Sequence, residues 1–193
     1  MSPVKARMIG DGMEESNILV TFHPNEKERA KVEIRELLKE VNHPAQSIVP
    51  VSVEGVYAVR IFEDGKEAIS KLKSLCMSRP SKFRFTFHWV PIDQWVPARL
   101  DKMQETAREL GKGIGRSERW KMHLHKRHSP EHAEELIIRL TDPIDRGVVD
   151  LKHPDKIVVV EIIGEMAGMS LAKVDEILDV HEIAQRMEIE IEM

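Results

Sequence analysis

Six apolar segments between residues 17 and 90 follow one another in an order of strand-like and helical patterns that is compatible with few folds. Four of them are short, with apolar residues that either alternate with polar ones or follow one another directly, which is typical of strands. The other two carry apolar residues at helical spacing. The strand-like segments are 17–22, 47–53, 56–62 and 83–89, and the helical ones are 25–42 and 64–78. The order β-α-β-β-α-β is that of a ferredoxin-like domain, in which two helices cover one face of an antiparallel sheet.

Two residues are predicted to begin these helices, Asn25 and Asp64, because their side chains can accept a hydrogen bond from a helical amide. An RNA-recognition motif would carry base-stacking aromatic residues where this chain has Val56 and Ala58. We therefore interpret residues 17–95 as a spacer and support.

A second unit is expected after the prolines of 91–97, because neither a strand nor a helix interior runs easily through two prolines. Its predicted elements are a helix over 100–110, a strand over 118–128, a helix beginning at Ser129 and strands over 148–151 and 157–163. The predicted organisation is a loosely ordered lead-in (1–16), a ferredoxin-like domain (17–95), a second domain (96–178) and a peripheral acidic tail (179–193).

The predicted strand at 118–128 has two different faces. Trp120, Met122 and Leu124 fall on one side, and charged or histidine side chains alternate with them on the other. The whole chain has a net charge of -4, yet residues 96–128 hold nine Lys and Arg against four Asp and Glu, a local charge of +5. This concentration favours a local polyanion site, although a merely solvated strand face would show the same alternation.

Composition excludes several classes of site. Cys76 is the only cysteine, which rules out disulfides, cysteine zinc sites and iron–sulfur clusters within one chain. No apolar run is long enough to cross a membrane and the N-terminus is too polar for a signal peptide, so we expect a cytoplasmic protein. No metal site is predicted, because His123 and His125 would point across an open sheet face without a nearby carboxylate. No catalytic centre and no cofactor are predicted.

A glycine-rich segment offers an alternative chemistry. Residues 108–113 match the R-x-x-G-x-G pattern with which one acetyltransferase superfamily binds the pyrophosphate of acetyl-CoA. That loop joins a strand to a helix, whereas here a helix precedes it and a strand follows. The glycines are better explained as the end of a helix and a close backbone passage.

Residues 96–175 resemble a THUMP domain, the tRNA-binding module of several RNA-modifying enzymes. The resemblance is carried by Arg119 and Lys126-Arg127, by Ser129, and by the segments 149–155, 158–162 and 168–170. With a ferredoxin-like domain before it, the chain is similar to the adaptors of tRNA cytidine acetylation. The expected fold class is therefore α/β of the α+β kind, a βαββαβ domain followed by a THUMP domain with a mixed sheet and flanking helices.

This resemblance implies a non-enzymatic adaptor that binds the acceptor end of tRNA and presents a cytidine to a separate RNA cytidine acetyltransferase, giving N4-acetylcytidine. The residues expected to bind RNA are Lys112, Arg116, Arg119, Lys121, His125, Lys126, Arg127 and Lys152. We expect Arg127 and Lys126 to contribute most, at the junction with the Ser129 helix, whose N-terminus could bind an anion.

Three alternatives stay open at this point. The chain could be an acetyl-CoA-dependent enzyme in its own right, or a THUMP protein that serves another modification enzyme. It could also be a protein-interaction module whose acidic tail meets the partner.

Overall fold

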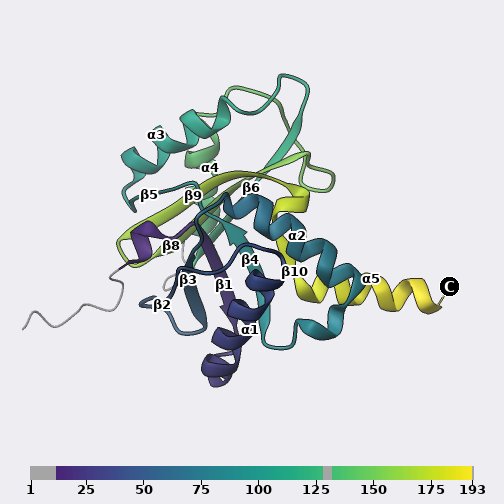
Figure 1. Ribbon diagram of the computed structural model, residues 1–193. Coiled ribbons are helices and arrows are strands. Elements are labelled where there is room, and N and C mark those ends of the chain that lie inside the picture. Colours follow the sequence, from purple (N-terminus) through teal and green to yellow (C-terminus); the bar gives the residue numbers. More distant parts are fainter. Residues whose placement is uncertain (1–11, 128–131, 193) are drawn as a thin grey trace, which may run out of the picture.

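Two five-stranded sheets pack face to face, with helices on both outer sides, in the computed structural model, which describes residues 12–127 and 132–192. The strand order is β10-β4-β1-β3-β2 in the first sheet and β5-β9-β8-β6-β7 in the second. Helices α1, α2 and α5 cover the first sheet, and α3 and α4 cover the second (Figure 1). The mixed α/β class predicted from the sequence is confirmed.

The first sheet contains the β-α-β-β-α-β order expected from the sequence. Its elements are β1 (Ile18–Phe22), α1 (Lys27–Glu40), β2 (Ser47–Pro50), β3 (Val56–Arg60), α2 (Gly65–Ser78) and β4 (Thr86–Pro91). The four strands pair antiparallel, with β1 between β3 and β4. Asp64 caps α2 as predicted, since its Oδ1 accepts from the Lys66 amide at 2.9 Å. Asn25 does not cap α1, because it lies inside a short 3-10 turn (Pro24–Glu26) that precedes the helix.

The second sheet is mixed. Its elements are β5 (Gln94–Pro97), α3 (Leu100–Gly111), β6 (Arg119–Lys126), α4 (Ala133–Thr141), β7 (Val148–Val149), β8 (Lys156–Ile163) and β9 (Met166–Lys173). Strand β6 runs parallel to β7 and β8, whereas β9 is antiparallel to both β8 and β5. Ser129, the expected N-cap of the fourth helix, lies outside the described residues.

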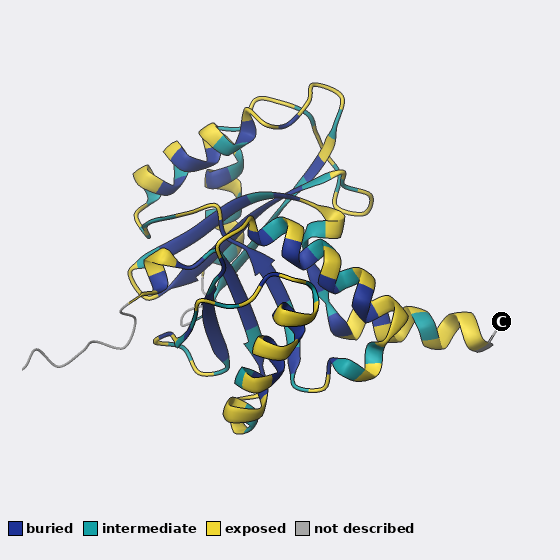
Figure 2. Cartoon of the chain, viewed as in Figure 1, coloured by how far each residue is buried: buried dark blue, intermediate teal, exposed yellow. Residues whose placement is uncertain are grey.

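The inner faces of the two sheets share one apolar core. Leu19, Ala58 and Val90 of the first sheet pack in one cluster with Ile157 and Val159 of the second. Figure 2 shows both sheets buried between helices whose outer faces are exposed. The segments 17–95 and 96–178 are therefore joined by a continuous packed interface, and not only by the chain between them.

The proline segment is more regular than the sequence suggested. Pro91 is the last residue of β4, and residues 94–97 form the edge strand β5, which the sequence did not predict. Proline is tolerated in both places because the end of a strand or a sheet edge does not need its missing donor. Strand β4 starts at Thr86 and not at Phe83, since the buried Glu33 carboxylate accepts from the amides ahead of the strand.

The C-terminal segment, expected to be a peripheral tail, is packed against the first sheet. Strand β10 (Leu178–Asp179) pairs with β4, and α5 (Val180–Glu192) follows it. Val180 and Ile183 are buried in the core beneath α2, whereas the far end of α5 is exposed (Figure 2). None of the helices in the described part of the chain is long and apolar enough to cross a membrane.

Candidate nucleic-acid interface

Strand β6 has the two faces that its alternation predicts. Trp120 is 2% exposed, and its indole Nε1 donates to the carbonyl of Arg146 at 3.0 Å. Met122 and Leu124 pack beside it in the core beneath α3 and α4. This face of the strand fixes β6 within the second sheet.

The opposite face of β6 is not the open surface that the sequence suggested. Lys121 and His123 pair with Ile157 and Val159, whose side chains pack against the first sheet, so this face of β6 points toward the first sheet as well. Both residues are only partly exposed. The face is covered because the two sheets stack on each other, which the sequence of β6 alone could not reveal.

A pocket of about 440 Å³ opens where β6 meets α2, α5 and the loop after β7. Four of its lining residues are basic and two are acidic: Lys73, Lys121, Lys152 and Arg186, with Asp179 and Glu182. Lys121 and Lys152 were predicted as RNA-binding residues, and the fold brings them into one pocket. Lys73 and Arg186 were missed, because they come from helices far away in the sequence.

The loop that carries Lys152 is held by Asp150, whose Oδ1 accepts from the amides of Lys152 and His153, each at 2.9 Å. Arg119 is tied to the end of the same loop. Its Nη2 donates to Oδ1 of Asp155 at 3.2 Å, and its amide donates to Oδ2 at 2.8 Å. The hydrogen bond from Arg119 holds the pKa of Asp155 below its usual range. Arg119 therefore orders the loop beside the pocket.

Arg127 and His125 contact a carboxylate that was not predicted from the sequence. Glu161 of β8 has a side chain only 1% exposed; its Oε2 accepts from Arg127 Nη2 at 3.0 Å, and its Oε1 lies 3.1 Å from His125 Nδ1. Burial alone would raise the pKa of Glu161, but the His125 hydrogen bond and the Arg127 charge outweigh it and lower the pKa. Arg127, expected to be an exposed phosphate ligand, is 19% exposed and neutralises this buried charge.

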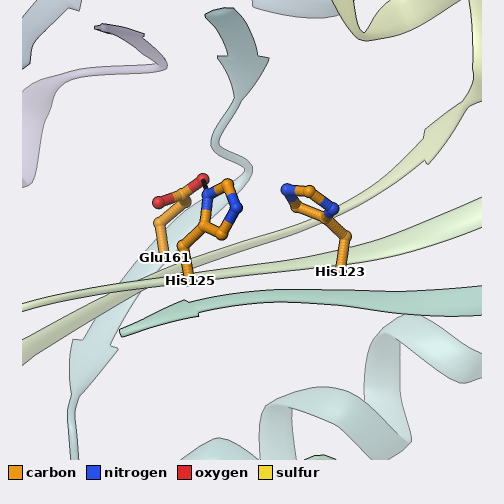
Figure 3. A group of neighbouring side chains, drawn as sticks. All are labelled: His123, His125 and Glu161. Carbon is orange, nitrogen blue, oxygen red and sulfur yellow. Dashed lines mark hydrogen bonds and ion pairs between the residues drawn. The ribbon is translucent and has the colours of Figure 1, made fainter. Parts of the chain in front are cut away.

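Glu161 also changes the assessment of the histidines. The sequence offered no carboxylate near His123 and His125, yet His125 and Glu161 are register partners in the parallel β6–β8 pair. Figure 3 shows the two imidazole rings next to each other, with Glu161 on the side of His125 away from His123. Burial, and then the neighbouring His125, lower the pKa of His123 to about 4.

The other predicted RNA-binding residues lie apart from the pocket. Lys112 and Arg116 are exposed on the loop between α3 and β6, where Lys112 Nζ pairs with Glu109 at 2.7 Å. Lys126 lies at the far end of β6, beside residues of α4 that include Glu135 and Arg139. The eight predicted residues therefore form several groups on the molecule and not one continuous surface.

The glycine-rich loop has its amides engaged within the chain. The amides of Lys112, Gly113 and Ile114 donate to the carbonyls of residues 109, 110 and 111. The Gly115 amide donates to Oε2 of Glu118 at 2.7 Å. A pyrophosphate site needs such amides free to point at the ligand, so this conformation of the loop is not a ready acetyl-CoA site.

No family model matches the chain, and no curated protein matches it. Among solved structures, PH1313 from Pyrococcus horikoshii Ot3 is similar at a TM-score of 0.58 and 16% identity, over 82% of this chain and 55% of that one. TrmN from Thermus thermophilus is similar at a TM-score of 0.48 and 21% identity, over 80% of this chain and 44% of that one. A 4-thiouridine synthetase in complex with RNA and ATP is similar at a TM-score of 0.41 and 14% identity, over 86% of this chain and 42% of that one. The chain thus spans about half the length of these proteins, and the likeness to PH1313 shows a shared fold.

Proposed function

We propose that this chain is a THUMP-type tRNA-binding adaptor, which presents a tRNA cytidine to a separate RNA cytidine acetyltransferase and carries no catalytic centre of its own. The residue pattern over 96–175 supports this proposal. The observation that carries it is the basic pocket beside β6, in which four cationic side chains face two carboxylates. Such an excess attracts a phosphate backbone even in a protein whose net charge is negative.

The size and position of the pocket favour a single-stranded end of RNA. Its volume of about 440 Å³ lies within the range of small-ligand pockets, and suits a few unpaired nucleotides better than a duplex. Lys121 lies on a strand and Lys152 on a loop held by Asp150, so both ammonium groups are carried by ordered backbone. We assign the acceptor end of tRNA to this pocket, with phosphates beside Lys121 and Lys152.

The packing of the two sheets suits the distance-setting role of an adaptor. An adaptor that binds the acceptor end must hold its partner enzyme at a fixed distance from that binding site. The apolar core shared by the two sheets fixes the position of one sheet relative to the other. The acetyltransferase partner and the cytoplasmic location belong to this proposal and rest on the resemblance.

The proposal is tested by removing the pocket lysines singly. Lys121→Ala and Lys152→Ala should keep the melting temperature nearly unchanged, because surface charges contribute little to stability. Their affinity for tRNA should fall, and each lost phosphate contact should flatten the dependence of log affinity on log salt by about 0.7–0.9. The matched control is Lys39→Ala, an exposed lysine of α1. Unchanged affinity and salt slope in both folded variants would contradict the proposal.

A further inference from the structure

Three histidines from both sheets meet where the inner faces of the sheets come together. His123 and His125 are two residues apart on β6 and therefore point to the same side of the second sheet. His88 of β4 lies on the first sheet, with its ring centroid 6.4 Å from that of His125. The centroids of His123 and His125 are 4.3 Å apart.

The imidazole ring of His125 has one nitrogen beside a carboxylate, and its other nitrogen is free to bind an ion. Its Nδ1 lies 3.1 Å from Glu161 Oε1, and because a carboxylate can only accept, Nδ1 carries the proton. The lone pair of the neutral ring is then on Nε2. In Figure 3 that side of the ring points toward His123. Metal-binding histidines commonly have this arrangement, in which a carboxylate fixes the nitrogen that does not bind the ion.

The other two rings each have a buried nitrogen without a hydrogen-bond partner among the described residues. These atoms are Nε2 of His123 and Nδ1 of His88. The second nitrogen of His88, Nε2, lies 3.1 Å from Oδ2 of Asp179, so this ring too is held by a carboxylate. A buried polar atom without a partner costs free energy, and a bound ion would supply the missing interaction.

We propose that His88, His123 and His125 bind a divalent first-row transition-metal ion and that this ion links the two sheets. With Zn–N bonds of about 2.0–2.1 Å, two imidazoles on one tetrahedral ion have centroids roughly 5 Å apart. The observed separations are 4.3 Å for His123–His125 and 6.4 Å for His88–His125, so the His88 ring has to move toward the other two rings to complete the site. Three nitrogen ligands suit Zn²⁺ and its neighbours better than Mg²⁺ or Ca²⁺.

Glu161 orients His125 in this site and does not bind the ion, because both of its oxygens are already engaged, Oε1 by His125 and Oε2 by Arg127. The ion has a route from solvent, because His88 and His123 also line the basic pocket. A water molecule on that side can provide the fourth ligand. This proposal does not depend on tRNA binding.

The experiment titrates Zn²⁺ into the metal-stripped full chain by calorimetry. We expect one saturable site and a rise in melting temperature, since a ligand that binds only the folded state stabilises it. His88→Gln and His123→Gln should each weaken binding strongly, and Glu161→Gln, which only orients His125, by about 10–100-fold. His153→Gln is the control, because His153 is exposed and lines the same pocket.

Co²⁺ gives a second measurement on the unmutated protein, which does not depend on how the variants fold. A site of three imidazoles and a water should give the intense visible absorption of tetrahedral Co²⁺. The absence of saturable Zn²⁺ binding by the unmutated chain, or equal binding by the folded His88→Gln and His123→Gln proteins, would overturn the proposal. An octahedral Co²⁺ spectrum would do the same.

Discussion

Removing Arg127 should destabilise the protein, although the charge pattern of β6 would classify it as a surface residue. Its guanidinium lies 3.0 Å from Glu161 Oε2, and the Glu161 side chain is 1% exposed. Losing one partner of a buried ion pair costs about 3–5 kcal/mol, because the other charge stays buried. The hydrogen bond between Glu161 and His125 remains in Arg127→Ala, and Arg127 is itself 19% exposed, so we expect the lower end, about 3 kcal/mol.

For a chain of this size each kcal/mol lowers the melting temperature by about 2–4 °C, which predicts a decrease of roughly 6–12 °C for Arg127→Ala. The assay is thermal and urea unfolding in the presence of EDTA, which keeps the protein free of metal. Arg116→Ala is the matched control, because Arg116 is exposed and should change stability by no more than about 0.5 kcal/mol.

Replacing Arg127 and Glu161 together by methionine should restore most of the loss, since a well-packed apolar pair can replace a buried ion pair. A decrease of less than about 2 °C in Arg127→Ala would refute this reasoning.

Four further outcomes follow from the same structure. Trp120→Ala should cost about 3–5 kcal/mol of unfolding free energy in urea titrations, because the ring is 2% exposed in the core beneath α3 and α4. Cys76 should react slowly with thiol reagents at neutral pH in the folded protein, since burial raises the pKa of its thiol to about 11. Asp155→Asn should lower the stability at pH 7. Hydrogen bonding to Arg119 lowers the pKa of Asp155 in the folded protein, so its contribution is fully present above the unfolded pKa of about 3.9. The stabilities of the variant and the unmutated protein should converge as pH falls through the lowered folded pKa. Calorimetry with acetyl-CoA should give no saturable heat, because the amides of Gly113 and Gly115 already donate within the chain.

Local features of the sequence predicted local features of the fold. The alternation of 118–128 placed Trp120 in the core, and Asp64 was identified as the first cap of α2, because both depend only on neighbouring residues. Strand β5 was missed because Pro91 and Pro97 indicated a linker, and because its pairing with β9 depends on a segment 69 to 75 residues away.

The candidate site was harder to predict because its residues meet only through the tertiary structure. The register of β6 against β8 places Glu161 opposite His125, and this pairing brings a buried carboxylate to Arg127 that the sequence did not predict. Lys73 and Arg186 reach the pocket from helices that lie on the other sheet. A charge count along the chain identified the basic strand but could not show which charges are neutralised inside the molecule.

The measurement that tests the central claim most directly compares the affinity of this chain for intact tRNA with its affinity for the same tRNA lacking the single-stranded 3′ end. If the basic pocket holds that end, its removal should weaken binding by about tenfold or more, because the contacts of Lys121 and Lys152 with its phosphates are lost. The Lys152→Ala protein should then discriminate less between the two RNAs. Equal affinity of the unmutated chain for both RNAs would contradict the account.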